Sequence, residues 1–229
     1  MREMIEENNI TVETPQADEP TIAHDSSWAT RLSRGLSWML HPFVVPLYVI
    51  GFMLLTDGFL SRLPVSVKSY LAWIVMLYAA IVPMLSIGFM RGLGLIKNLG
   101  LHSQRSRLLP LLVGVISYVL CAVTLSDVAV ATLVRKFVLA AACCEALALI
   151  VTPFWKISLH LICMGGVTAM FMLLSVAGAG QHFWALVVTI LLSGALASAR
   201  LHLGAHNPWQ VAAGYFGGLT AAILAMIYL

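Results

Sequence analysis

Long apolar runs are the feature that most constrains how this chain can fold. Seven of them fall at about residues 40–57, 68–90, 108–126, 133–153, 159–178, 183–200 and 208–228. A helix that crosses a bilayer needs about 20 mostly apolar residues. The sequence is 60% hydrophobic and 10% charged, whereas soluble domains average about 25% charged residues. The chain is therefore predicted to be an all-α, polytopic transmembrane helical bundle with about six to seven spans. We expect a multi-pass integral membrane protein, with a bacterial inner membrane as its location.

The N-terminal part of the chain has a different composition. Seven of the ten acidic residues precede position 36, and the remaining chain holds three acids against ten Lys or Arg. We expect residues 1–27 to form a disordered acidic tail and residues 28–229 to form the transmembrane domain. After the tail, large apolar side chains recur at helical spacing, at Trp28, Leu32, Leu36 and Met39. This pattern predicts a short interfacial helix that leads into the membrane.

Three polar interruptions of the apolar body are predicted to meet at one face of the bilayer. They are residues 90–110, 153–160 and 199–206, which follow the second, fourth and sixth runs. Because successive spans alternate in direction, the exits of even-numbered spans emerge on the same side. Counts of Lys and Arg near the spans leave both orientations of this face open.

The residue types in these interruptions favour phosphate chemistry. Guanidinium groups match phosphate oxygens in pairs, and the amides at a helix N-terminus favour anions. Imidazoles act as nucleophiles or proton donors near neutral pH. The candidates that hold phosphate are Lys97, Arg105, Arg107, Ser158 and Arg200, and the candidate imidazoles are His160 and His206.

The same residues resemble the type 2 phosphatidic acid phosphatase superfamily of integral membrane lipid phosphatases. Its motifs are K-x6-R-P, P-S-G-H and S-R-x5-H-x3-D, in that order. The third is similar to Arg200, five residues, His206, three residues and Gln210. The second is similar to Ile157-Ser158-Leu159-His160, and the first, more loosely spaced, to Lys97 with Arg105, Arg107 and Pro110.

The resemblance implies a role for each matched residue. His206 would accept the phosphoryl group, His160 would protonate the leaving alcohol, and Gln210 would orient His206. The residues that would hold the phosphate oxygens are Lys97, Arg105 or Arg107, Ser158 and Arg200. The family works without a metal or other cofactor on phosphorylated membrane lipids. Residues 28–229 would then be a transmembrane phosphatase-like domain whose partners are a phosphorylated lipid and the bilayer, and not a nucleic acid.

Two departures from the motifs keep a second function open. Gln210 stands where the family has an aspartate, and Leu159 stands where it has a glycine. In a serine protease triad, replacing the corresponding aspartate by its amide lowers kcat by about 10⁴. The first expectation is hydrolysis of a lipid phosphomonoester or diphosphate through a phosphohistidine. The alternative is a catalytically impaired relative that binds a phosphorylated lipid without hydrolysing it.

The sequence supports only weaker predictions for the other polar and small residues. Glu145 lies deep in the fourth run, where a charge costs about 2.5–3.5 kcal/mol on insertion scales, and its role is left open between function and structure. His202 and His206 are four residues apart, but no carboxylate or cysteine completes a metal site. No chemical role is expected for His41 or His182. The glycines of 213–218 and 165–166 are expected to allow close helix packing.

Overall fold

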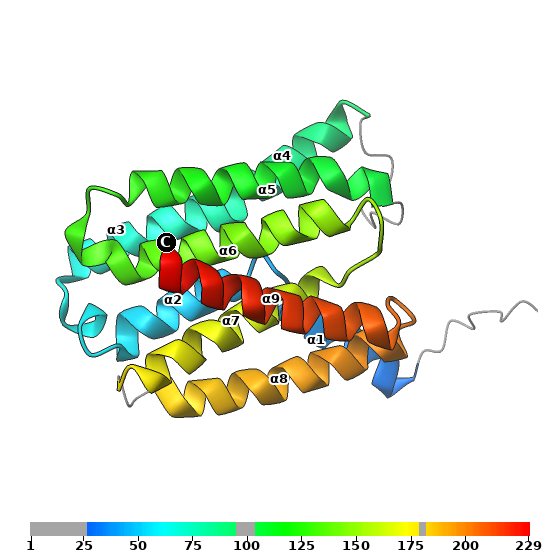
Figure 1. Ribbon diagram of the computed structural model, residues 1–229. Coiled ribbons are helices and arrows are strands. Elements are labelled where there is room, and N and C mark those ends of the chain that lie inside the picture. The colour runs from blue at the N-terminus through cyan, green and yellow to red at the C-terminus, as the bar shows by residue number, and fades with distance from the viewer. Residues whose placement is uncertain (1–26, 95–103, 179–181) are drawn as a thin grey trace, which may run out of the picture.

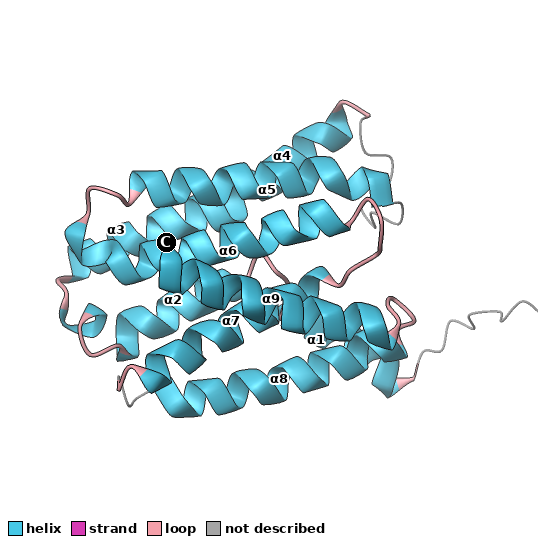
Figure 2. Cartoon of the chain, in the orientation of Figure 1, coloured by secondary structure: helices cyan, strands magenta, loops and turns pink. Residues whose placement is uncertain are grey.

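The computed structural model describes residues 27–94, 104–178 and 182–229, and the side chains of 104–106 are not among the described ones. Within these ranges every regular element is a helix (Figure 2). This confirms the all-α prediction. Residues 1–26 of the predicted tail lie outside the described residues, and Ser27 caps the first helix. The helices run roughly alongside one another across the bundle (Figure 1).

Five helical segments of the described chain are long and apolar enough to cross a membrane. They are α3 to α4 (Val65–Gly92), the α5 segment Arg107–Thr124, α7 (Leu159–Val176), α8 (Phe183–His202) and α9 (Pro208–Tyr228). These helices indicate a multi-pass integral membrane protein. The whole of α5 covers Gln104–Thr124 and α6 covers Thr132–Val151. All begin and end within a few residues of the apolar runs in the sequence.

The first apolar run forms a shorter helix than expected. α2 covers only Val45–Thr56, and twelve residues rise by about 18 Å, well below the roughly 30 Å of a bilayer core. α1 (Trp28–Met39) precedes it and packs its buried Ser33 and Ser37 toward the bundle, while Trp28 and Trp38 are exposed. The expected helix over 28–39 is confirmed. Leu32 and Met39 are also exposed, whereas Leu36 packs against the core.

A π-helical turn interrupts the long segment Val65–Gly92. This turn, η2 (Leu77–Ile81), separates α3 (Val65–Met76) from α4 (Val82–Gly92) just before Pro83. A proline inside a helix cannot donate its backbone hydrogen bond, and π turns absorb such irregularities. The hydroxyl of Ser117 on α5 donates to the carbonyl of Tyr78 in the turn. A hydrogen bond from the neighbouring helix α5 therefore satisfies a carbonyl group in the irregular stretch of backbone.

α7 and α9 form the closest helix pair, and glycines make that approach possible. A Cβ at Gly165 would overlap the carbonyl of Tyr215, and a Cβ at Gly218 would overlap the carbonyl of Ile162. A Cβ at Gly214 would lie 2.8 Å from the carbonyl oxygen of Ser158. The expectation that these glycines allow close packing is confirmed.

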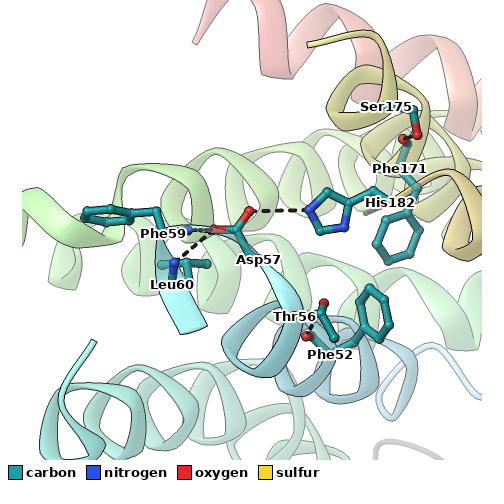
Figure 3. Close-up of polar contacts among 8 residues, drawn as sticks. All are labelled: Phe52, Thr56, Asp57, Phe59, Leu60, Phe171, Ser175 and His182. Atoms are coloured by element: carbon teal, nitrogen blue, oxygen red, sulfur yellow. Dashed lines mark hydrogen bonds and ion pairs between the residues drawn. The ribbon is translucent and has the colours of Figure 1, made fainter. Parts of the chain in front are cut away.

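Asp57, at the end of α2, and His182, at the start of α8, point toward each other (Figure 3). Oδ1 of Asp57 accepts hydrogen bonds from the amides of Phe59 and Leu60, both at 2.9 Å. Oδ2 lies 3.4 Å from Nε2 of His182. The His182 ring is fully buried and stacks on Phe171 at 6.2 Å. The sequence reading gave His182 no partner and was wrong, because that partner lies 125 residues away.

The glycine contact predicts a large difference between two substitutions. Gly218→Ala places a methyl group against the Ile162 carbonyl and should destabilise the protein by about 1–3 kcal/mol or more. Gly194→Ala on α8 meets nothing within 4 Å and should leave stability unchanged or raise it by at most about 1 kcal/mol. Denaturation in mixed micelles compares the two. Equal effects would show that α7 and α9 do not touch at Gly218.

Asp57 offers a second stability test. Asp57→Ala removes the acceptor of two amides and of His182 and should cost about 1–3 kcal/mol, the penalty for leaving buried donors unpaired. Asp57→Asn retains a carbonyl oxygen for the two amides, so it should lose less stability than the alanine variant. The same denaturation assay measures both variants. A larger loss in Asp57→Asn would contradict the hydrogen-bond geometry.

Candidate functional site

A cavity of about 800 Å³ opens within the bundle. Its walls are mostly apolar, with Met84 and Ile87 from α4, Leu111 from α5, Phe137 from α6 and Val167 from α7. Cavities of roughly 300–1,000 Å³ are typical of ligand sites, and apolar walls with a few placed polar groups are their usual composition. The volume and the walls suit an amphiphilic molecule.

Positively charged and imidazole side chains gather at one end of this cavity. The residues that line it there are Arg91, Arg107, Arg200, His41, His160 and His206. They come from the end of α4, the start of α5, the start of α7, the end of α8 and the turns beside them, which lie toward the right of the view (Figure 1). The polar segments therefore converge on one end of the bundle, as alternating spans require. Among the described residues that line the cavity, Glu145 is the only acid.

The turn between α8 and α9 places His206. Gly204 adopts a positive φ of 60° and ends α8, a conformation that favours glycine. Asn207 then caps α9: its Oδ1 accepts from the amide of Gln210 at 2.9 Å, and Oε1 of Gln210 accepts from the amide of Asn207 at 3.2 Å. Pro208 occupies the first turn, where its missing N–H costs nothing. Asn207 and Pro208 therefore fix where α9 begins, directly after His206.

Gln210 also contacts the candidate nucleophile. Nδ1 of His206 lies 3.2 Å from Oε1 of Gln210. An amide oxygen only accepts, so Nδ1 carries the proton of this hydrogen bond. The other ring nitrogen, Nε2, then holds the lone pair in the neutral ring. The structure therefore brings Gln210 and His206 together, with the amide oxygen of Gln210 fixing the orientation of the imidazole.

The charge state of His206 follows from its surroundings. Burial lowers the pKa of His206 to about 4, and the positive charge of Arg200 acts in the same direction. The hydrogen bond to Gln210 raises that pKa, while Lys156 and Arg107 lower it further. At neutral pH the ring is neutral, and Nε2 is available as a nucleophile or as a hydrogen-bond acceptor.

His160 lies at the same end but is bound to α1. Its Nε2 is 3.0 Å from the carbonyl oxygen of Ser37. A carbonyl only accepts, so that proton points to α1. The His41 ring packs edge-on against the His160 ring, with centroids 5.5 Å apart. Nδ1 of His41 accepts from the amide of Phe43 at 3.3 Å, which leaves the proton of the neutral ring on Nε2.

Ser158 lies at the start of α7 but does not line the cavity. It is fully buried, and its hydroxyl has no hydrogen-bond partner among the described residues. Its amide donates to the carbonyl of Gln210 at 3.3 Å. This bond joins the N-terminal ends of α7 and α9. Nε of Arg200 is a second buried donor without a partner in the described part of the chain.

Apart from Ser158, the predicted phosphate-binding residues divide into two pairs. Arg107 and Arg200 line the cavity beside His160 and His206. Lys97 and the side chain of Arg105 lie outside the described residues. His41 and Arg91 line the cavity although the sequence reading gave them no chemistry. The available signal was the position of His41 in the sequence. It stands at the start of the first apolar run, on the same side of the bilayer as the exits of the even-numbered runs.

The pKa of His206 makes a testable prediction about pH. The unfolded chain binds a proton on this imidazole near pH 6.5, and the folded protein binds it near pH 4. Between these values the unfolded state holds more protons, so stability should fall as the pH drops from about 6.5 to about 4. NMR titration of labelled histidines, with His206→Asn to identify the resonance, should show a midpoint near 4. A midpoint at 6.5 or above would contradict the buried, cationic setting.

No protein-family model, curated protein or solved structure matches this chain. The features that bear on function are the cavity, its cationic end and the His206–Gln210 contact.

Proposed function

We propose that the protein hydrolyses a phosphate ester or diphosphate on a membrane lipid through a phosphohistidine at His206. The observation that supports it most is that a neutral His206, oriented by Gln210 at 3.2 Å, lines a largely apolar cavity beside Arg107 and Arg200. The apolar walls suit an acyl or prenyl chain, and the guanidinium groups suit phosphate oxygens. The motif resemblance to the type 2 phosphatidic acid phosphatases agrees with this reading.

In the proposed reaction, Nε2 of His206 attacks phosphorus and the bond from phosphorus to the lipid oxygen breaks. The Nδ1 proton stays on the ring and is held by Oε1 of Gln210. The departing lipid oxygen takes a proton from the imidazole pair formed by His41 and His160. We assign the donated proton to His41, because His160 directs its Nε2 proton to Ser37. Water then attacks phosphorus and the bond from phosphorus to Nε2 of His206 breaks. The water gives one proton back to Nε2 of His41, and inorganic phosphate is released.

In this proposal the chain crosses the membrane seven times. α6 has 20 residues, enough to rise about 30 Å, and it packs against α5, α7 and α9. Its cationic residues lie near its start, where Nζ of Lys136 donates to the carbonyl of Met226 at the end of α9. The first crossing is proposed for α2 together with the residues that flank it, because its helix alone rises by only about 18 Å. The cavity end then lies near one surface of the bilayer.

A second function has a specific observation in its favour. Gln210 supplies a neutral amide oxygen to His206, and an amide cannot stabilise the positive charge that develops on an attacking imidazole. A carboxylate in that position favours the imidazolium form. The same cavity would then bind a phosphorylated lipid without turning it over.

Phosphate release separates these two functions. Purified protein in lipid nanodiscs is given lipid phosphomonoesters and prenyl diphosphates with a metal chelator present. Wild type should release phosphate slowly, and His206→Ala should release none. Gln210→Glu keeps the length and the capping bond of Gln210 while adding a carboxylate, so it should be faster, by up to the roughly 10⁴ that the reverse change costs in a serine protease triad.

The controls decide the interpretation. Gln210→Asp places the carboxylate of the resembling family at the same position and should also exceed wild type. Phosphate release from wild type that persists in His206→Ala would reject the phosphohistidine. If wild type and all variants are folded and bind the lipid phosphates but release no phosphate, hydrolysis is rejected and the binding function remains.

A further inference from the structure

We propose that Glu145 is a second polar anchor in the cavity and selects ligands with a hydrogen-bond donor on the apolar chain. The donor is a hydroxyl or amino group about 10 Å from the phosphate. This distance is the rise of the helix between the levels of the two polar anchors. This inference rests on the proposed function, which places the phosphate head of the ligand, and it adds a requirement on the apolar chain of the ligand. Glu145 lines the same cavity as His206 and Arg200 but takes no part in the proposed reaction.

Helix geometry gives the separation of the two anchors. The carboxyl of Glu145 lies directly against Gly114 on α5. Gly114 follows Arg107 by seven residues on the same helix, and seven residues rise by about 10 Å. On α6, Glu145 precedes the helix end at Val151 by six residues, or about 9 Å. Both helices place the carboxyl well inside the bundle, away from the cationic end.

Gly114 shows that the carboxyl has a fixed place. A Cβ at this position would overlap Oε1, Oε2 and Cδ of Glu145. The absence of a side chain on α5 therefore leaves a notch in which the carboxyl rests. α5 and α6 pack closely along their length, so the notch is part of a helix interface.

The carboxyl has no hydrogen bond or ion pair within the described chain. Tyr118, Cys144 and Cys163 lie near it and also line the cavity. These side chains make the deep part of the cavity locally polar among apolar walls. An ionisable residue inside a membrane protein is costly and is usually retained for binding or transport. A ligand that donates a hydrogen bond would satisfy Glu145.

The two anchors define a ligand with two polar groups. The phosphate occupies the end with Arg107, Arg200 and His206, and the chain runs along the apolar walls toward Glu145. A plain hydrocarbon chain would leave the carboxyl unpaired in an apolar cavity. A hydroxyl or amino group at the right carbon would pair with it, so the cavity should prefer the substituted chain.

Binding to synthetic amphiphiles tests this preference. Isothermal titration in nanodiscs compares dodecyl phosphate with dodecyl phosphates that carry one hydroxyl or amino group at successive carbons. Wild type should bind the best substituted chain about tenfold more tightly than the plain one, which corresponds to one hydrogen bond. Glu145→Leu should lose the preference while still binding dodecyl phosphate. Glu145→Gln should retain a preference for the hydroxyl and lose one for the amine, because it keeps the carbonyl oxygen and loses the acid.

The outcomes separate this inference from the proposed function. Equal affinity for plain and substituted chains in wild type and Glu145→Leu would overturn the role of Glu145 and leave the phosphate site intact. Failure of folded wild type to bind any alkyl phosphate would overturn both. A preference that survives in Glu145→Leu would assign the donor to another residue and would also overturn the proposal.

Chemical labelling tests the position of the carboxyl without any ligand assumption. Dicyclohexylcarbodiimide, an apolar reagent that couples to carboxyl groups, should label Glu145 in wild type and not in Glu145→Gln. Asp127 is exposed, so a water-soluble carbodiimide should label it, and this reaction serves as the control. Prior addition of the preferred amphiphile should block labelling of Glu145 and not of Asp127. Absence of apolar labelling at Glu145 would show that the carboxyl does not open to the cavity.

Discussion

The backbone contact between α7 and α9 is the interaction on which the rest of the structure depends. In a bilayer, apolar side chains gain little from leaving lipid, so helices associate through close packing. Gly165, Gly214 and Gly218 let the two backbones touch. That contact brings the amide of Ser158 to the carbonyl of Gln210. The start of α7, with His160, and the start of α9, with His206 just before it, are consequently held at one end of the bundle.

The sequence predicted much of this arrangement because the determinants are local. Apolar runs, the cap at Asn207 and Pro208, and the small residues of α9 can be read along the chain. The alternation of spans also predicted that the polar segments converge. The short α2 and the π turn before Pro83 were not predicted, because both depend on neighbours such as Ser117 that compensate irregular backbone. Hydropathy alone does not report such compensation.

The candidate site was predictable in part, for the same reason. Arg107, Arg200, His160 and His206 were found by type and spacing, and the cavity includes all four. His41 was missed because its neighbour in space, His160, lies far along the chain. Asp57 and His182 were missed in the same way. Ser158 was selected by its motif position, and its role as a phosphate ligand stays a prediction; in the structure its amide joins two helices.

The position of α1 has a mechanical consequence. Its exposed tryptophans, Trp28 and Trp38, belong to the residue type that settles at lipid headgroups. The same helix is joined to the end of α8 through Thr30 and His202, 3.2 Å apart, and to α7 through Ser37 and His160. A change in lateral tension or curvature that displaces α1 must therefore strain or break the hydrogen bond that orients an imidazole of the cavity. The physical state of the surrounding lipid and the geometry of the site are coupled through one amphipathic helix.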